Sequence, residues 1–220
     1  MNKVVALDEA IAHIKDGDVV MIGGFMANGT PEKLVDALVE ANIKDITLIC
    51  NDTGFINRGS GKLVSNKQCK KIIASHIGTN KETGRQMTEG ETEVVLIPQG
   101  TLVEQIRAGG YGLGGVLTAT GIGTLVEEGK EKIVVDGKEY LLEKPITADV
   151  ALLYAAKADK AGNIVYKGSA NNFNNIMAGA AKTTIVEAGE LVEIGAIDPN
   201  EVVTPNIFVN YIVDGGKLNG

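Results

Sequence analysis

This chain of 220 residues lacks tryptophan, and its aromatic residues together make up only 4% of the sequence. Histidine and cysteine are equally scarce: His13 and His76 lie far apart, and Cys50 and Cys69 do not form a Cys-x-x-Cys motif. Zinc sites and disulfide-dependent folds need closely spaced sets of these residues. The sequence therefore predicts no metal site and two reduced thiols, and we expect structural roles for both histidines.

Positive charge is also scarce, because the chain has 21 lysines and arginines but 28 aspartates and glutamates, which gives a net charge of −7. Such a surface does not attract nucleic acid or anionic membranes, so neither is expected as a partner. The long uncharged run at residues 108–126 contains seven glycines and three threonines, which disfavour a membrane-spanning helix. Asp8 and Glu9 precede any long apolar stretch, unlike the residues of a signal peptide, and we expect a cytoplasmic protein.

The chain does contain 44% hydrophobic residues and 28 glycines, and its length predicts a single domain over residues 1–220. Residues 19–22 form a short apolar run that ends at a glycine pair, as in a strand buried on both faces. A helix is predicted next, with Thr30 as its cap, Pro31 as its first residue and an apolar face over residues 34–39. A second apolar run then completes a βαβ unit at residues 46–50.

The same alternation continues along the chain and predicts a mostly parallel sheet. Further predicted elements are strands at residues 71–74, 94–97, 150–154, 164–166 and 184–186 and a helix at 101–108. Asp136 and Gly137, between two runs of β-forming residues, predict a two-residue turn and thus an antiparallel hairpin excursion. The predicted fold class is α/β, a single open, mostly parallel twisted sheet with helices on both faces, and residues 215–220 are expected to fray.

The glycine-rich turn after the first strand is the strongest candidate for a binding site. Gly23, Gly24 and Gly29 can let a ligand approach the main chain, and free N–H groups at the start of the next helix can bind phosphate or another anion. The alternative is a tight βα turn in which the glycines only accommodate unusual dihedral angles. The residues themselves leave both interpretations open.

Other nucleotide and hydrolase motifs are absent or out of place. Gly110, Gly112 and Gly115 match G-x-G-x-x-G, but they follow a predicted helix instead of a strand, which argues against a dinucleotide site. The chain contains neither a phosphate-binding G-x-x-x-x-G-K-[ST] loop nor a G-x-S-x-G nucleophile elbow. The sequence therefore predicts no NAD enzyme, P-loop hydrolase or serine hydrolase.

Gln99 lies in a Pro-Gln-Gly-Thr segment that follows the predicted strand at 94–97. Open α/β sheets bind their ligands at the carboxyl ends of the strands. The amide of Gln99 is therefore a candidate hydrogen-bond donor to an oxyanion that develops on a substrate carbonyl, although it supplies no proton. A loop glutamine that only holds the main chain in place is the alternative.

Several segments of the chain are together similar to those of one enzyme family. Asp16-Gly17 through Gly23-Gly24-Phe25, followed by Gly29 and Pro31, resembles the signature of the family I coenzyme A transferases. The resemblance extends over nearly the whole chain. Further segments that resemble the alpha subunits of bacterial acetate or butyrate–acetoacetate CoA-transferases are Asn51-Asp52-Thr53, Ser75 to Asn80, Pro98 to Thr101, Arg107 to Gly110 and Ala148 to Leu152.

The resemblance implies an enzyme that moves coenzyme A between a short-chain acyl-CoA and a free acid such as acetate, butyrate or acetoacetate. In that family a glutamate nucleophile passes through an anhydride and a glutamyl-CoA thioester. This glutamate stands in a Ser-Glu-Asn-Gly motif of the beta subunit, and the present chain has no such motif. The resemblance therefore implies an alpha subunit that is inactive alone and joins a beta subunit in a hetero-oligomer, α2β2 or larger.

The resemblance also implies which residues form the site. Gln99 becomes the oxyanion donor to the thioester, and coenzyme A is a substrate here, with no bound cofactor expected. Coenzyme A would contact the loop of Gly24, Phe25, Met26, Ala27, Asn28, Gly29 and Thr30. We expect the other subunit to cover an apolar, glycine-rich surface at residues 109–123. A sugar-phosphate isomerase or a phospholigand-binding protein of related fold, using the loop without a partner, is the alternative function.

Overall fold

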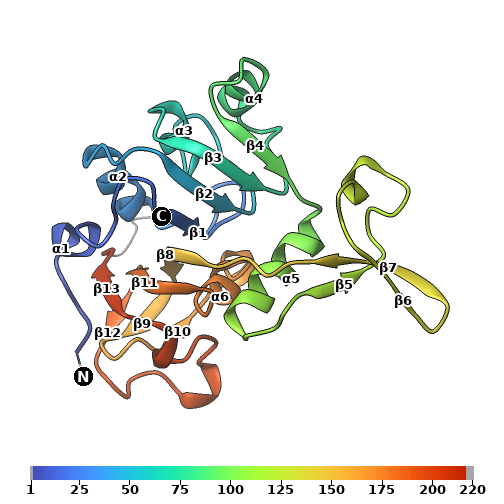
Figure 1. Cartoon of the computed structure of the whole chain (residues 1–220). Helices are drawn as coiled ribbons and strands as arrows, with labels where there is room; N and C mark the ends of the chain where they lie inside the picture. The colour runs from blue at the N-terminus through green and yellow to red at the C-terminus, as the bar shows by residue number, and fades with distance from the viewer. Residues whose placement is uncertain (1, 217–220) are drawn as a thin grey trace.

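The computed structural model describes residues 2–216 (Figure 1). In chain order the elements are α1 (Leu7–Ile11), β1 (Val19–Ile22), α2 (Glu32–Glu40), β2 (Ile46–Cys50), α3 (Gly61–Ser65), β3 (Cys69–Ala74), α4 (Lys81–Thr88), β4 (Glu93–Leu96), α5 (Gln99–Gly110), β5 (Val116–Thr118), η1 (Leu125–Glu127), β6 (Lys132–Val135), β7 (Lys138–Glu143), β8 (Ala148–Ala155), β9 (Lys157–Asp159), β10 (Ile164–Val165), η2 (Gly168–Ala170), α6 (Asn174–Met177), β11 (Ala181–Ala188), β12 (Leu191–Val192), η3 (Pro199–Glu201), η4 (Asn206–Phe208) and β13 (Tyr211–Asp214). Of the segment predicted to fray, residues 217–220 lie outside the described residues. Gly215 is held in place, because its N–H donates to the carbonyl of Ala188 at 2.8 Å.

The main sheet has seven strands in the spatial order β13-β11-β8-β1-β2-β3-β4, and all neighbouring strands are parallel, as the alternation predicted. The chain starts with β1 in the middle of the sheet and adds β2, β3 and β4 on one side. It then returns to add β8, β11 and β13 on the other side. The strand order therefore reverses between β1 and β8, and such a switch point is where open α/β sheets place their ligands.

Helices cover both faces of this sheet, which confirms the predicted layers. Consecutive residues of β1 face opposite sides, since side chains alternate along a strand. Val20 packs with Leu34 of α2 in a core that also includes residues of α1 and α3. Met21 packs with Leu102 of α5 and Met177 of α6 in the other core. Burial on both faces explains why the strands have continuous apolar runs.

The prediction that residues 164–166 complete the main sheet was wrong. Ile164 and Val165 form β10, which pairs with β9 in a separate sheet of order β10-β9-β12. The polar turn between β9 and β10 explains this pairing. Oδ1 of Asp159 accepts hydrogen bonds from the main-chain N–H groups of Ala161, Gly162 and Asn163, at 2.9 to 3.0 Å. The chain thus folds back at once, and its strands pair with each other.

The predicted hairpin is confirmed and forms part of a third sheet, of order β5-β7-β6. Asp136 and Gly137, with φ angles of 50° and 76°, make the turn between β6 and β7. We call residues 111–143 the arm, and Figure 1 shows its yellow-green strands projecting from the rest of the molecule. Glu143 anchors the base of the arm, because its carboxylate binds Lys130 of the arm at 2.6 Å and Gln105 of α5 at 3.2 Å.

The uncharged run at residues 108–126 forms the last turn of α5, the connection to β5, β5 itself and the following loop into η1. None of the helices within residues 2–216 is long and apolar enough to cross a membrane.

Candidate active site at the carboxyl edge of the sheet

The two segments that the sequence singled out lie at the same edge of the sheet. Residues 23–30 follow β1, and Gln99 is the first residue of α5, just after β4. Because all these strands are parallel, the polar ends of β2 and β3 lie between them. Asn51 and Asp52 follow β2, and His76 follows β3. The carboxyl edge therefore carries a row of polar residues from four neighbouring strands.

The tip of the glycine loop is a tight turn in an unusual conformation. Phe25 and Asn28 exchange main-chain hydrogen bonds of 3.0 and 2.9 Å. Between them, Met26 and Ala27 both adopt positive φ angles, 49° and 63°, which cost free energy for residues with a side chain. Oδ1 of the buried Asp52 holds the turn, because it accepts the N–H of Met26 at 2.9 Å. Phe25 and Met26 remain 38% and 44% exposed and form the apolar tip of the loop.

The glycines of this loop make room for the protein itself. A Cβ at Gly23 would lie 1.9 Å from Oδ1 of Asn174, and one at Gly24 would lie 2.1 Å from Oγ1 of Thr30. At Gly29 the main chain of Ala170 would be 2.7 Å away. Packing within the protein therefore accounts for glycine at these three positions, which are themselves buried, and the exposed residues of the loop are Phe25, Met26 and Asn28.

The expected anion site at the start of the next helix is also wrong. Glu187, at the buried end of β11, accepts the N–H groups of Lys33 and Leu34 through Oε2 at 2.9 and 3.2 Å. Burial raises the pKa of Glu187, although these two hydrogen bonds oppose the shift. Helix α2 begins at Glu32, and neither Thr30 nor Pro31 caps it through a side chain. A carboxylate from a distant strand therefore occupies the place that the sequence suggested for phosphate.

Asp52 connects the loops after β1 and β2. Its Oδ1 binds Met26, and its Oδ2 accepts the N–H of Gly54 at 3.0 Å. Asn174 plays a similar part on the other side of the loop, where Nδ2 donates to the carbonyl of Gly29 at 2.9 Å and Oδ1 accepts the N–H of Tyr154 at 3.1 Å. Sequence reasoning did not assign these roles; the only signal for Asp52 was a polar residue close to a strand end, and Asn174 lies at the start of α6.

Gln99 is held in a fixed position at the carboxyl edge. Its Nε2 donates to Oδ1 of Asn51 at 2.7 Å, and Oγ of Ser75 donates to the same oxygen at 3.1 Å. Asn51 is buried, whereas Gln99 is exposed. One amide hydrogen of Gln99 is thus bound within the protein, and the second is available to a ligand. This arrangement suits a neutral hydrogen-bond donor to a developing oxyanion.

His76 is exposed at the end of β3, and its main chain forms an isolated parallel bridge with Asp52. Its ring lies over Gly78, where a Cβ would be 2.8 Å from Cε1. The structural role expected for His76 stays a prediction. Among residues 2–216, no group of three or more histidine, cysteine, aspartate and glutamate side chains is placed to hold a metal ion. Cys50 and Cys69 are buried free thiols, as predicted.

A pocket of about 340 Å³ lies at the switch point, between the glycine loop and the end of β8. We call it the switch pocket; its lining residues are Ala27, Asn28, Gly29, Thr30, Glu32, Arg58 and Tyr154. Four of these residues belong to the segment that the sequence proposed for binding. The pocket therefore joins the predicted loop to residues that the sequence did not single out, notably Arg58 and Tyr154.

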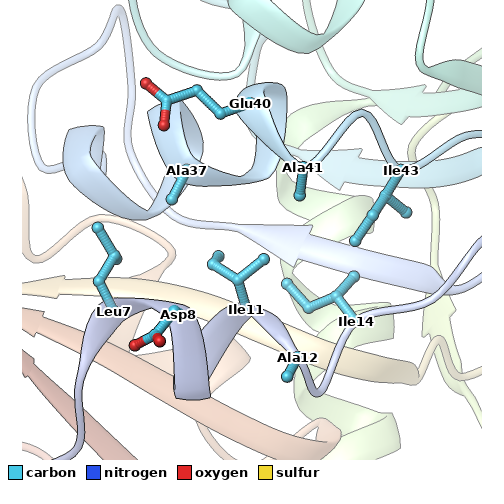
Figure 2. A pocket seen from close by; sticks show the side chains of 9 residues that line it. All are labelled: Leu7, Asp8, Ile11, Ala12, Ile14, Ala37, Glu40, Ala41 and Ile43. Carbon is cyan, nitrogen blue, oxygen red and sulfur yellow. The ribbon is translucent and has the colours of Figure 1, made fainter.

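A larger groove of about 540 Å³ lies between α1 and α2. Figure 2 shows that apolar side chains line it, with Leu7 and Ile11 on one side and Ala37 on the other. Its charged residues are the carboxylates Asp8 and Glu40. The groove lies beside the second half of α2, near the amino ends of the strands, and so it does not contribute to the edge that carries Gln99.

Comparisons with known proteins show which family this chain is similar to. The family model described as "Coenzyme A transferase" matches residues 4–215. The acetate CoA-transferase subunit alpha of Escherichia coli K12 is 53% identical over 96% of both chains. The acetoacetyl-CoA:acetate/butyrate CoA transferase alpha subunit of Clostridium acetobutylicum is 55% identical over 96% of this chain and 97% of its own.

Solved structures share the fold at lower identity. The acyl-CoA transferase of E. coli O157:H7, solved as a thioester complex with CoA, superposes with a TM-score of 0.87 at 20% identity. The match covers 100% of this chain but 49% of that one, so this chain spans about half of its length. Glutaconate coenzyme A-transferase from Acidaminococcus fermentans superposes with a TM-score of 0.86 at 22% identity, over 96% of this chain and 75% of its own. With a family match over nearly its whole length, this chain belongs to the coenzyme A transferase family.

Proposed function

We propose that this chain is the alpha subunit of an enzyme that moves coenzyme A between a short-chain acyl-CoA and a free carboxylic acid. The observation that carries the proposal is identity above 50%, over 96% of the chain, to relatives named as alpha subunits of acetate and acetoacetyl-CoA:acetate/butyrate CoA-transferases. Acetate, butyrate and acetoacetate are accordingly the proposed acids. The alternative of a sugar-phosphate isomerase or phospholigand-binding protein gains no support from these relatives.

The proposed reaction needs a carboxylate nucleophile that this chain does not supply at the site. Two glutamates beside the glycine loop are already engaged, since Glu32 binds Lys62 at 2.6 Å and Glu187 binds the start of α2. The chain also lacks a Ser-Glu-Asn-Gly segment. We infer that a beta subunit brings the catalytic glutamate to the carboxyl edge of this sheet.

In this scheme a carboxylate oxygen of that glutamate attacks the thioester carbonyl carbon, and the thiolate of coenzyme A leaves. The thiolate then attacks the glutamyl carbonyl of the resulting anhydride, which releases the first acid and leaves a glutamyl-CoA thioester. The second acid takes up coenzyme A by the reverse steps. Negative charge develops on the carbonyl oxygen at each attack. The second amide hydrogen of Gln99 is proposed to stabilise that charge, and the loop from Gly24 to Thr30 to contact coenzyme A.

The arm is the proposed contact with the beta subunit. The expectation from the sequence was an apolar, glycine-rich surface at residues 109–123. In and beside this segment lie large apolar side chains that are exposed in the single chain: Tyr111, Leu113, Leu117, Leu125, Val134 and Val135. Contact between apolar side chains and water is unfavourable, and a small sheet has little core to offset it. Apolar patches of this kind are typical of subunit interfaces. Association as α2β2 or larger, in the cytoplasm, remains part of the proposal.

The first experiment measures transfer of coenzyme A from acetoacetyl-CoA to acetate. The purified chain is compared with the chain co-expressed with the product of the neighbouring gene. We expect activity only in the co-expressed pair, because the nucleophile comes from the partner. Transferase activity in the single chain would contradict the inference that the partner supplies the nucleophile. Absence of activity in both samples, together with activity of the single chain on a phosphosugar, would overturn the proposed function in favour of an isomerase.

A further inference from the structure

Beside the switch pocket lies a second pocket that the proposed mechanism does not use. This second pocket has a volume of about 480 Å³ and lies where β8 and β11 end. Two lysines, Lys157 and Lys167, and two tyrosines, Tyr154 and Tyr166, line it. We call it the lysine pocket. Tyr154 lines both pockets, so the two form neighbouring parts of one surface.

The position of Tyr154 between the pockets is defined by its neighbours. Its main-chain N–H binds the buried Asn174, which also holds Gly29 of the loop. Its hydroxyl lies against Gly189, where a Cβ would be only 2.6 Å away. Gly189 does not have a positive φ angle, so its backbone does not require glycine. Glycine is required there because the hydroxyl of Tyr154 approaches so closely. Tyr154 thereby forms a wall that both pockets share.

Positive charge gathers along this surface in a chain whose net charge is −7. Arg58 lines the switch pocket, and the two lysines line the lysine pocket. Of the carboxylates nearby, Glu187 pairs with Tyr154 across β8 and β11, but it is buried and binds the start of α2. Glu32 is already paired with Lys62 at 2.6 Å. Glu190 lies 3.9 Å from Lys157 in a half-exposed pair, and such loose surface pairs contribute little.

The aromatic side chains add a second feature. The hydroxyl of Tyr166 is hydrogen-bonded to Oγ1 of Thr204 at 2.9 Å, which fixes the ring at the side of the lysine pocket. Tyrosine rings are surfaces on which purine bases stack, and lysines are binding groups for phosphate. A pocket that combines both suits a ligand with a phosphorylated purine nucleotide at one end.

The spacing of the strands relates this pocket to Gln99. Gln99 follows β4, and Tyr154 lies in β8, four strands away in the order β4-β3-β2-β1-β8. Neighbouring strands lie about 4.8 Å apart, so the two strand ends are separated by roughly 19 Å along the sheet edge. Coenzyme A has its reactive sulfur at one end of an extended arm and its phosphorylated adenosine at the other. The strand ends from β4 to β11 offer a place for each end of the molecule, with Gln99 at β4 and the lysine pocket at β8 and β11.

We propose that the lysine pocket binds the phosphorylated adenosine end of coenzyme A, with Lys157 and Lys167 facing its phosphates, while the thioester lies near Gln99. This inference rests on the proposed function and adds the orientation in which coenzyme A would lie. Coenzyme A would run along the carboxyl edge, past the glycine loop and Tyr154, across the switch point. Affinity for coenzyme A would then depend on residues that take no part in the acyl transfer itself.

The test uses the enzyme assembled with its beta subunit. The double variant K157Q/K167Q removes both charges at the pocket, and the control K15Q/K70Q removes two exposed lysine charges outside both the pocket and the arm. Steady-state kinetics are measured with acetoacetyl-CoA and with its analogue that lacks the 3′-phosphate. We expect KM for acetoacetyl-CoA to rise about tenfold in K157Q/K167Q, which corresponds to about 1.4 kcal/mol, with kcat retained. The control should match the wild type.

The analogue separates phosphate recognition from a general effect. The wild type should discriminate between the two substrates, and K157Q/K167Q should lose most of that discrimination. An unchanged KM, or an equal rise in KM for both substrates, would overturn the proposed pocket while leaving the transferase function intact. Absence of transfer by the wild-type pair would instead contradict the proposed function. An unchanged thermal midpoint of K157Q/K167Q would establish that the variant folds.

Discussion

The side-chain amide of Gln99 donates a hydrogen bond of 2.7 Å to Oδ1 of Asn51. The two residues follow β4 and β2, which are separated by β3 in the sheet. Asn51 is buried at the end of its strand, so a fixed residue orients an exposed one. A donor held in place before the reaction needs no reorganisation when charge develops, and this is the condition for strong oxyanion stabilisation.

Replacement of Gln99 should therefore reduce catalysis more than binding. We expect Gln99→Ala in the assembled enzyme to lower kcat by about 100-fold, the usual cost of one lost oxyanion donor. Gln99→Glu has nearly the same shape but no N–H donor, and it should be at least as slow. Steady-state kinetics with acetoacetyl-CoA and acetate measure both. Turnover at the wild-type level in either variant would remove Gln99 from the mechanism.

The glycine loop should tolerate no side chain at Gly24. A methyl group there would lie 2.1 Å from Oγ1 of Thr30, and the φ angle of 116° is itself unfavourable for alanine. We expect Gly24→Ala to destabilise the chain by about 2 kcal/mol or more, measured by chemical denaturation.

The control for this prediction is Gly84→Ala, within helix α4, where a Cβ would meet no atom within 4 Å. Alanine favours a helix over glycine, so Gly84→Ala should stabilise the chain by roughly 0.5 to 1 kcal/mol. Equal effects of the two substitutions would contradict the close packing described for the loop.

Glu187 makes stability depend on pH in a defined direction. Burial raises its pKa above the ordinary value of 4.5, so the folded protein binds this proton more tightly than the unfolded chain. Stability contributed by the bound proton is present at low pH and is lost as pH rises from about 4.5 through the raised pKa. Glu187→Gln keeps a carbonyl acceptor for the start of α2 but cannot titrate.

The difference in thermal midpoint between Glu187→Gln and the wild type should accordingly shift in favour of the variant across that pH range. Differential scanning calorimetry at a series of pH values measures the shift. A difference that stays constant with pH would mean that the pKa of Glu187 is the same in the folded and unfolded states.

The arm should make the isolated chain associate with itself. Leu125 is 83% exposed, and Leu117 on β5 is 42% exposed. We expect sedimentation of the single chain to reveal concentration-dependent association, and L117K/L125K to reduce it and to weaken recovery of the beta subunit by co-purification. Ile207 is similarly exposed, at 79%, but lies outside the arm, so Ile207→Lys is the control. A single chain that stays monomeric over a wide concentration range would contradict this use of the arm.

Local signals were sufficient for much of the architecture. The first two strands occur at the predicted residues 19–22 and 46–50, because short apolar runs that end at glycine or polar residues are typical of strands buried on both faces. The hairpin turn at Asp136 and Gly137 was predictable, since few other dipeptides adopt two positive φ angles at low cost. The position of Gln99 after β4 follows from the same pattern of elements.

Partners that are distant in sequence were not predictable. The start of α2 looked like a free anion site until β11 brought Glu187 to it, and the loop glycines looked open until Asn174 and Ala170 filled the space beside them. Residues 164–166 looked like a strand of the main sheet, but a local polar turn directs them into another one.

The sequence by itself determined the α/β class, most of the strands, the resemblance to the coenzyme A transferases and the absence of the Ser-Glu-Asn-Gly segment, because each depends on residues that are close together in the chain. Tertiary structure alone decided the strand order, with its reversal between β1 and β8, and hence which loops meet. Tyr154, Lys157 and Lys167 face the same edge as the glycine loop for this reason. Contacts between distant segments arise from the packing of the whole sheet, and no local pattern of residues encodes them.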